Sequence, residues 1–385
     1  MDFEKYKILK ILKKTTGILL GASSLGLALL GSFHPRLVEV LYSRGLFMGL
    51  RRMADAVLAF LPFPACYILL AVLVGWGMVR IRDFVVKRGI RPATAEQQRA
   101  PLRGIVVGSR AVFRAFRPLL NGLGWLLFFF FWMWGFNYYR LPVEQQLGLA
   151  PVPLDGAALK SAFEEESRAL AEARRQLPGS KGRAFAESDL PSGLEDTVRD
   201  ALTSVLRRSG YPTAGKVRVR LLQPSGVLLR FSTAGVYLPF SAEGHVDKGL
   251  HPVQWPFTLA HEMAHGYGFG DEGVCNFWAA LACLQSKDPG IRYAGRLAYW
   301  RYVAVEYRRY DPEGFRKARE ALPREIVLDL EAIQKAMDRY PDLVPRLQYQ
   351  LYDSYLKSQG IKEGMKSYSQ VLLLVRSWEE KHQKL

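Results

Sequence analysis

Cysteine is scarce in this chain of 385 residues, which contains only Cys66, Cys275 and Cys283. Three cysteines cannot build a disulfide framework, and none lies in the Cys-x-x-Cys pair typical of zinc or redox sites. Net charge is also small over residues 141–385, where 33 Lys and Arg face 30 Asp and Glu. These shortages exclude a disulfide-stapled scaffold and a basic soluble domain.

The positive charge that the chain does carry lies in its N-terminal part. The net charge is +17, and residues 1–140 hold 20 Lys and Arg against 6 Asp and Glu. Ten of the basic residues lie between 80 and 117. A topogenic stretch resting on anionic lipid explains them, so we expect no nucleic-acid partner.

Three apolar stretches in the same region are long enough to suggest membrane spans, since a helix crosses a bilayer with about 20 apolar residues. They cover about 17–33, 54–78 and 119–138. Pro62 and Pro64 are expected to kink the second helix. The first is interpreted as a retained helix, because Ser32-Phe33-His34-Pro35 does not resemble a signal-peptidase site. Residues 1–140 are therefore predicted to form an anchor of three transmembrane helices.

Basic residues beside the spans predict the orientation of this anchor. The N-terminal tail has five Lys and residues 80–117 have ten Lys and Arg, against four at 34–53 and Arg140 alone after the third span. Because positive charge stays on the cytoplasmic side, the tail and residues 80–117 are placed in the cytoplasm. Everything after Arg140 is then extracytoplasmic.

The remaining chain reads as an α+β fold with few strands. Residues 141–156 contain three prolines and are predicted to be a linker, followed by a domain over 157–385. Helical periodicity covers 159–177 and 194–208, and helical patterns continue from Pro256 almost to the end. Between 216 and 240 the period changes to two, which predicts three short antiparallel strands in the segments KVRVRLL, GVLLRFS and GVYLPF.

One short motif carries chemistry, the sequence His261-Glu262-Met263-Ala264-His265. Pro256 suits a first helical turn, so a helix is expected over about 256–266. Residues four apart lie on one face of a helix. Both imidazoles can then bind one Zn²⁺ while Glu262 points to the same region.

A third ligand is expected from the next helix. Glycines at 266, 268 and 270 end the first helix, and Asp271 is a good N-cap for a new one. Glu272 would supply an anionic ligand and leave a position open for water. Asn276, one turn later, is a candidate to orient one of the ligands.

These motifs resemble known families. HEMAH followed by Glu272-x-x-x-Asn276 resembles the gluzincin arrangement, in which two His and a downstream Glu bind zinc. The longer run HEMAHGYGFGDEGVCNFWAALACL, with GVYLPFSAEGHVD before it and YDSYLKSQGIKEGMKSY after it, is similar to an uncharacterised bacterial family of membrane-anchored HExxH proteins. The resemblance implies a zincin-like fold in the bacterial inner membrane and leaves the substrate open.

The sequence thus predicts a zinc metallopeptidase that acts on a peptide or protein substrate. Zn²⁺ held by His261, His265 and Glu272 would activate water, and Glu262 would take its proton. A tyrosine from later in the chain would stabilise the negatively charged oxygen that forms when water attacks the peptide carbonyl. Tyr368 or Tyr352 is favoured, because the segments that resemble the family surround them. The other candidates are Tyr302, Tyr307 and Tyr355. The strand at 235–240 either lines the cleft or is an ordinary core strand.

Two other functions are compatible in principle with a His-Glu-x-x-His motif. A zinc-stabilised envelope scaffold or partner-binding domain would use the same ligands without turnover, but it has no need of Glu262. An intramembrane protease would need its ligands inside an apolar span, and residues 241–275 contain none. The expected partners are a substrate polypeptide and the lipid bilayer.

Overall fold

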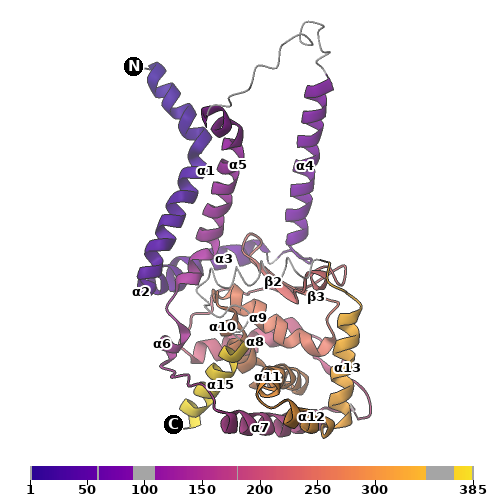
Figure 1. Ribbon diagram of the computed structural model, residues 1–385. Coiled ribbons are helices and arrows are strands. Elements are labelled where there is room, and N and C mark those ends of the chain that lie inside the picture. Colours follow the sequence, from indigo (N-terminus) through magenta and orange to yellow (C-terminus); the bar gives the residue numbers. More distant parts are fainter. Residues whose placement is uncertain (1, 59, 90–108, 180, 344–367, 384–385) are drawn as a thin grey trace.

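Three long helices rise from one side of a mainly helical body in the computed structural model (Figure 1). The structure describes residues 2–58, 60–89, 109–179, 181–343 and 368–383. The rising helices are α1 (Asp2–Phe33), α4 (Cys66–Gly89) and α5 (Ser109–Met133). The N-terminus lies at the end of α1 that is remote from the body.

Two helical segments of the described chain are long and apolar enough to cross a membrane, rather than the three expected. They are Thr15–Phe33 within α1 and Phe116–Met133 within α5. The first matches the stretch predicted at 17–33. The second ends earlier than the predicted 119–138, because the short 3-10 helix η3 (Gly135–Tyr139) follows α5.

The expected helix over 54–78 is wrong. Helix α3 (Phe47–Leu58) ends before the two prolines, and α4 starts only after them. Pro62 and Pro64 lack the N–H groups that a continuous helix needs, so they separate two helices instead of kinking one. The apolar run of α4 then ends at Val79, since charged residues follow it at 80, 82 and 83.

Helices α1 and α5 pack closely because glycines line their contact. A Cβ atom on Gly124 would lie 2.1 Å from the carbonyl oxygen of Gly17, and one on Gly21 would lie 2.7 Å from the Cα atom of Gly124. Asn121 Oδ1 accepts a hydrogen bond of 2.8 Å from the Gly17 amide. Small residues are the usual means of close helix packing in apolar surroundings.

The body consists of helices around a small sheet. The predicted helices at 159–177 and 194–208 are confirmed as α7 (Gly156–Arg175) and α8 (Leu194–Arg208). Its helices are α6 (Val143–Leu147), α7 (Gly156–Arg175), α8 (Leu194–Arg208), α9 (Trp255–Gly266), α10 (Glu272–Leu284), α11 (Pro289–Tyr310), α12 (Pro312–Glu320), α13 (Arg324–Asp338) and α15 (Tyr368–Gln383). Short connecting helices are α2 (Pro35–Leu37), η1 (Val38–Leu46), η4 (Glu187–Asp189), η5 (Leu229–Phe231) and η6 (Pro252–Gln254).

The sheet is mixed, so the expected antiparallel arrangement is wrong. Its order is β1 (Val219–Leu222), β3 (Glu243–Asp247) and β2 (Gly235–Leu238). Strand β1 runs parallel to β3, with Val219 opposite Gly244, and β2 runs antiparallel to it, with Val236 opposite His245. The central strand is thus the segment that the sequence patterns did not identify.

A buried aspartate explains why residues 226–232 are not the predicted strand. Asp247, at the end of β3, accepts hydrogen bonds from the amides of Gly226, Leu228 and Leu229. These bonds draw the segment into the 3-10 turn η5. Because Glu243, His245 and Asp247 are polar yet fully buried, β3 lacks the alternation of apolar and polar residues that marks a strand.

The main core lies between α7, α8, α9, α10, α11 and α15. Trp278, Leu202 and Ile291 are fully buried in it. Val143 and Leu149, from the stretch predicted to be a linker, are part of the same core. Helix α9 packs against α8, α10, α11 and the three strands of the sheet.

Candidate metal centre

Helix α9 presents both histidines of the motif on one face. Pro256 lies in its first turn, where the missing N–H costs no hydrogen bond. Ala260, Met263 and Ala264 are fully buried and fix the opposite faces. The helix ends at Gly266, and the chain turns away at Gly268, whose φ of +88° favours glycine.

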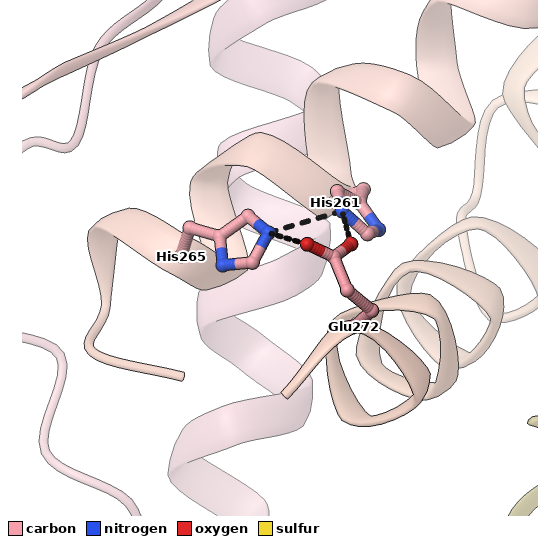
Figure 2. A group of neighbouring side chains, drawn as sticks. All are labelled: His261, His265 and Glu272. Carbon is pink, nitrogen blue, oxygen red and sulfur yellow. Dashed lines mark hydrogen bonds and ion pairs between the residues drawn. The ribbon is translucent and has the colours of Figure 1, made fainter. Parts of the chain in front are cut away.

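The structure brings His261, His265 and Glu272 together as the sequence predicts (Figure 2). One ligand atom from each lies within 4.8 Å of the others. The Nε2 atoms of the two histidines are 3.1 Å apart. Glu272 Oε2 is 3.1 Å from His261 Nε2, and Oε1 is 3.7 Å from His265 Nε2.

These separations fit a single tetrahedral metal ion. Ligand atoms at 2.0–2.1 Å from zinc are separated by about 3.3 Å along each edge of a tetrahedron. The two imidazole nitrogens, 3.1 Å apart, are close to that value, and each carboxylate oxygen of Glu272 lies near one of them, Oε2 at 3.1 Å from His261 Nε2 and Oε1 at 3.7 Å from His265 Nε2. Two imidazole nitrogens and one carboxylate are also a donor set that zinc favours. The residues present therefore fit the ion that the motif implies.

The other nitrogen of each imidazole is held in place. His261 Nδ1 donates a hydrogen bond of 2.8 Å to Asn276 Oδ1, and His265 Nδ1 donates one of 2.8 Å to the carbonyl of Phe269. A proton on Nδ1 leaves the Nε2 lone pair free for a metal ion. Asn276 thus lies where the sequence proposed an orienting residue. The Phe269 carbonyl was missed, because a backbone oxygen leaves no mark in a sequence.

Glu262 lies beside the cluster in a closed space. Glu262 is only 4% exposed, and its Oε2 atom has no hydrogen-bond partner among the described residues. Burial raises the pKa of this carboxyl, against the opposing effect of His261 and His265. A carboxyl group with a raised pKa is suited to exchange protons near neutral pH.

Two glycines of the sheet make room for Glu262. A Cβ atom on Gly235 would lie 2.6 Å from Glu262 Oε1, and one on Gly244 would lie 2.9 Å from Glu262 Cβ. Gly235 begins β2 and Gly244 lies in β3, so both strands pack directly on α9. The position of β2 beside the catalytic candidate agrees with either role considered for it, cleft wall or core strand.

The ligand cluster favours positive charge. Burial alone would raise the pKa of Glu272, but the imidazoles of His265 and His261 outweigh it and hold that pKa far below its usual range. Burial opposes protonation of His265, yet Cys275 and Glu272 raise its pKa well above the ordinary value. A proton or a metal cation is therefore stabilised between these groups.

Cys275 is a contact of the site that the sequence did not single out. Its Sγ atom is 3.4 Å from His265 Nδ1 and donates a bond of 3.4 Å to the Phe269 carbonyl. Burial raises the pKa of the Cys275 thiol to about 11. At neutral pH the group is a thiol rather than a thiolate, and it packs behind the ligand His265.

The candidate oxyanion tyrosines are only partly located. Tyr352 and Tyr355 lie outside the described residues, and Tyr368 is the first residue of α15 with its side chain also outside them. Tyr307 is buried and stacks on Phe163, away from the ligands. The start of α15 approaches the site, because a Cβ atom on Gly273 would lie 2.1 Å from Gln370 Oε1.

The residues after α5 hold the C-terminal end of α9. Trp134 Nε1 donates a hydrogen bond of 2.7 Å to the carbonyl of His265, and Arg140 Nη1 donates one of 2.7 Å to the carbonyl of Gly268. Arg140 is itself paired with the buried Glu39. The apolar N-terminal region and the candidate metal centre are therefore one connected structure.

The three residues of the cluster are little exposed. The side chains of His261 and Glu272 are 13% and 23% exposed, against 10% for His265. Two hollows of the described surface, of about 400 and 350 Å³, are lined by residues of α8, of β1, of α9 and of the segments beside them, and they do not contain His261, His265 or Glu272.

Fold and site together describe an α+β protein in which one helix carries His-Glu-x-x-His and the next supplies a facing glutamate. The chain belongs to the family described as a protein of unknown function (DUF3810), whose family model matches residues 42–375. The expected membership of an uncharacterised family is thereby confirmed. No curated protein and no solved structure matches the chain.

Proposed function

We propose that this chain is a membrane-anchored zinc metallopeptidase. The observation that supports it best is the buried carboxyl group of Glu262, whose Oε2 atom has no hydrogen-bond partner among the described residues, beside the cluster of His261, His265 and Glu272. An unpaired buried carboxyl group costs stability. A site that only held zinc for structure would have no need of it, whereas a hydrolase needs such a base.

The residues of the chain have distinct tasks in this proposal. His261, His265 and Glu272 hold the ion, which when bound supplies a Lewis acid that lowers the pKa of water to about 7. Asn276 and the Phe269 carbonyl keep both imidazoles in the tautomer that leaves Nε2 free. Glu262 accepts the proton of the attacking water and passes it to the leaving amine.

The substrate is proposed to lie along β2. Gly235 brings this edge strand directly against Glu262. An extended peptide that added to this edge of the sheet would bring its backbone next to the carboxyl group. Tyr368 remains our proposed oxyanion stabiliser, because the start of α15 lies next to Gly273 and thus next to the ligand Glu272.

The membrane anchor is proposed to hold the body on the extracytoplasmic face of the bacterial inner membrane. Figure 1 supports this arrangement, since α1, α4 and α5 all rise from one side of the body and the N-terminus lies at the remote end. Of the basic residues at 80–117, Arg80, Arg82, Lys87 and Arg88 lie in the C-terminal part of α4. Positive charge on one side fits the cytoplasm.

Activity and metal content of the full chain in detergent test the proposal. We expect zinc in the wild type and in Glu262→Gln, with cleavage of a peptide mixture only by the wild type. Glu313→Gln, which alters an exposed glutamate of α12, is the matched control and should cleave normally. Absence of zinc from the wild type would overturn the proposal.

The second candidate is a non-catalytic zinc-stabilised scaffold or partner-binding domain. It is favoured by the burial of His265 and by the absence of the ligands from the two hollows described above. In this case zinc would be present in both glutamate variants and in the wild type, with no cleavage by any of them. Loss of zinc would then unfold the domain.

A further inference from the structure

Residues 35–58 and 60–63 form an element with a broad, mainly apolar outer face on the surface of the body. It consists of α2, η1, α3 and the turn after α3. In Figure 1, α3 lies across the top of the body at the foot of the rising helices. Glycines apart, its exposed residues are mainly apolar: Leu37, Val40, Leu41, Leu46, Met53, Ala56, Val57, Phe60, Pro62 and Phe63, with Arg36 and Arg52 as the charged ones.

The inward side of this element combines the buried apolar residues Tyr42, Phe47, Met48 and Leu58 with charged side chains that are bonded to the body. Arg51 is 2% exposed, pairs with Asp55 and donates hydrogen bonds to Tyr237 Oη at 3.0 Å and to the carbonyl of Ala242 at 2.7 Å. Glu39 binds Arg44 and Arg140. A helix on a protein surface in water turns its charged side chains outwards, whereas here Glu39 and Arg51 are buried and the outer face is mainly apolar.

We propose that this element lies in the plane of the membrane, with its apolar outer face in the boundary between headgroups and acyl chains. A helix with one broad apolar face, placed parallel to the surface, binds a bilayer in this way. The chain continues from this element into apolar helices at both ends, since α1 ends at Phe33 and α4 begins at Cys66. This continuity identifies lipid, rather than a second protein, as the occupant. The proposal rests on the membrane anchoring proposed above and is independent of the metal chemistry.

The same contacts connect the lipid-facing element to the metal-binding helix. Tyr237, which accepts the bond from Arg51, lies against Gly266 at the end of α9, where a Cβ atom would be 3.2 Å from its ring. The candidate centre is thus held at a fixed depth below the element.

Spin-label accessibility in vesicles of phosphatidylethanolamine and phosphatidylglycerol tests the proposal. Met53→Cys and Val57→Cys would be labelled in a Cys66→Ser background, in which Cys275 and Cys283 are buried. Val152→Cys in the body is the matched control, because Val152 and Met53 are both 69% exposed. Leu119→Cys, from a residue 67% exposed on α5, marks the bilayer itself.

We expect labels at 53 and 57 to collide with dissolved oxygen, which concentrates in lipid, and to be shielded from a water-soluble nickel complex, as at 119. The label at 152 should show the opposite pattern. If 53 and 57 behave like 152 while 119 reports lipid, the in-plane position is wrong although the anchor is right. Shielding of 53 and 57 from both reagents would mean that a second protein covers them. A water-like pattern at 119 would overturn the membrane anchor itself.

Discussion

Glu262 occupies a space that only glycine leaves open at position 235. A methyl group there would lie 2.6 Å from Glu262 Oε1. We therefore expect Gly235→Ala to displace the carboxyl group and to lower peptidase activity on the order of 100-fold, since a misplacement of about 1 Å has such an effect. Zinc content should not change. Gly193→Ala is the matched control, because a Cβ atom there meets no neighbour. Equal activity of both variants would contradict this role of Glu262.

His245 makes the folded protein sensitive to acid. Burial lowers the pKa of this imidazole from 6.5 to about 4. Below pH 6.5 the unfolded chain binds a proton that the folded chain does not, so stability falls as the pH falls towards 4. The loss is about 2 kcal/mol at pH 5.

His245→Asn should remove this part of the pH dependence. The measurement is thermal unfolding in detergent at pH 7 and pH 5, with a chelator present in every sample so that loss of metal does not contribute. Wild type should lose more stability than the variant between the two values. Equal losses would show that His245 is protonated in the folded state.

The ligand residues could be predicted because their spacing is dictated by helix geometry. His261 and His265 are one turn apart, and Asp271 marks the start of the helix that returns Glu272 to them. The contacts of the Phe269 carbonyl and of Cys275 with His265 could not be predicted from the sequence, since they depend on how the chain turns between α9 and α10. The space around Glu262 depends on the sheet, which sequence periodicity located poorly.

At the scale of single elements, α10 supplies both the proposed ligand Glu272 and Asn276, which accepts a hydrogen bond from the proposed ligand His261. Asn276 lies one turn after Glu272 and accepts a bond of 2.8 Å from His261 Nδ1. We expect Asn276→Ala to weaken zinc binding about 10–100-fold, as is usual when such a contact is lost. Competition with a chromophoric chelator would measure the change. Asn276→Asp retains the acceptor and should bind zinc close to normally, and a normal affinity in Asn276→Ala would show that the bond has no role.

The elements themselves were predictable to different degrees. Amphipathic helices such as α7 and α8, and helices with a side-chain cap such as α7 and α10, have strong local signals, and their positions agree with the sequence. Strand β3 has none, because Glu243 is buried only through Arg218 and the amide of Ala65, which are distant in sequence. The break between α3 and α4 shows that two prolines outweigh a continuous apolar composition.

At the scale of the whole molecule, the N-terminal region is part of the folded body. The amide of Ala65 donates a bond of 2.6 Å to Glu243, and Arg218 binds the carbonyl of Leu58. Removal of residues 1–140 would take these hydrogen bonds from the buried Arg218–Glu243 pair, and a lost hydrogen bond to a buried charged group costs about 1.5–3 kcal/mol. We expect the fragment 141–385 to aggregate or to unfold without a cooperative transition.

The control for this prediction is the full chain in the same detergent, which should show one cooperative transition. Circular dichroism and size exclusion would compare the two proteins. A fragment that is monodisperse and melts like the full chain would show that the body folds by itself and that the contacts of residues 39–65 add little.

The central claim is that His261, His265 and Glu272 together bind one zinc ion. The most direct measurement is the metal content of the full chain, purified without added metal, by mass spectrometry alongside the variants His265→Ala and His382→Ala. His382, an exposed histidine that stacks on Trp378, is the matched control. The account predicts one zinc per chain in the wild type and in His382→Ala, and none in His265→Ala. Zinc at the same level in His265→Ala, or none in the wild type, would contradict it.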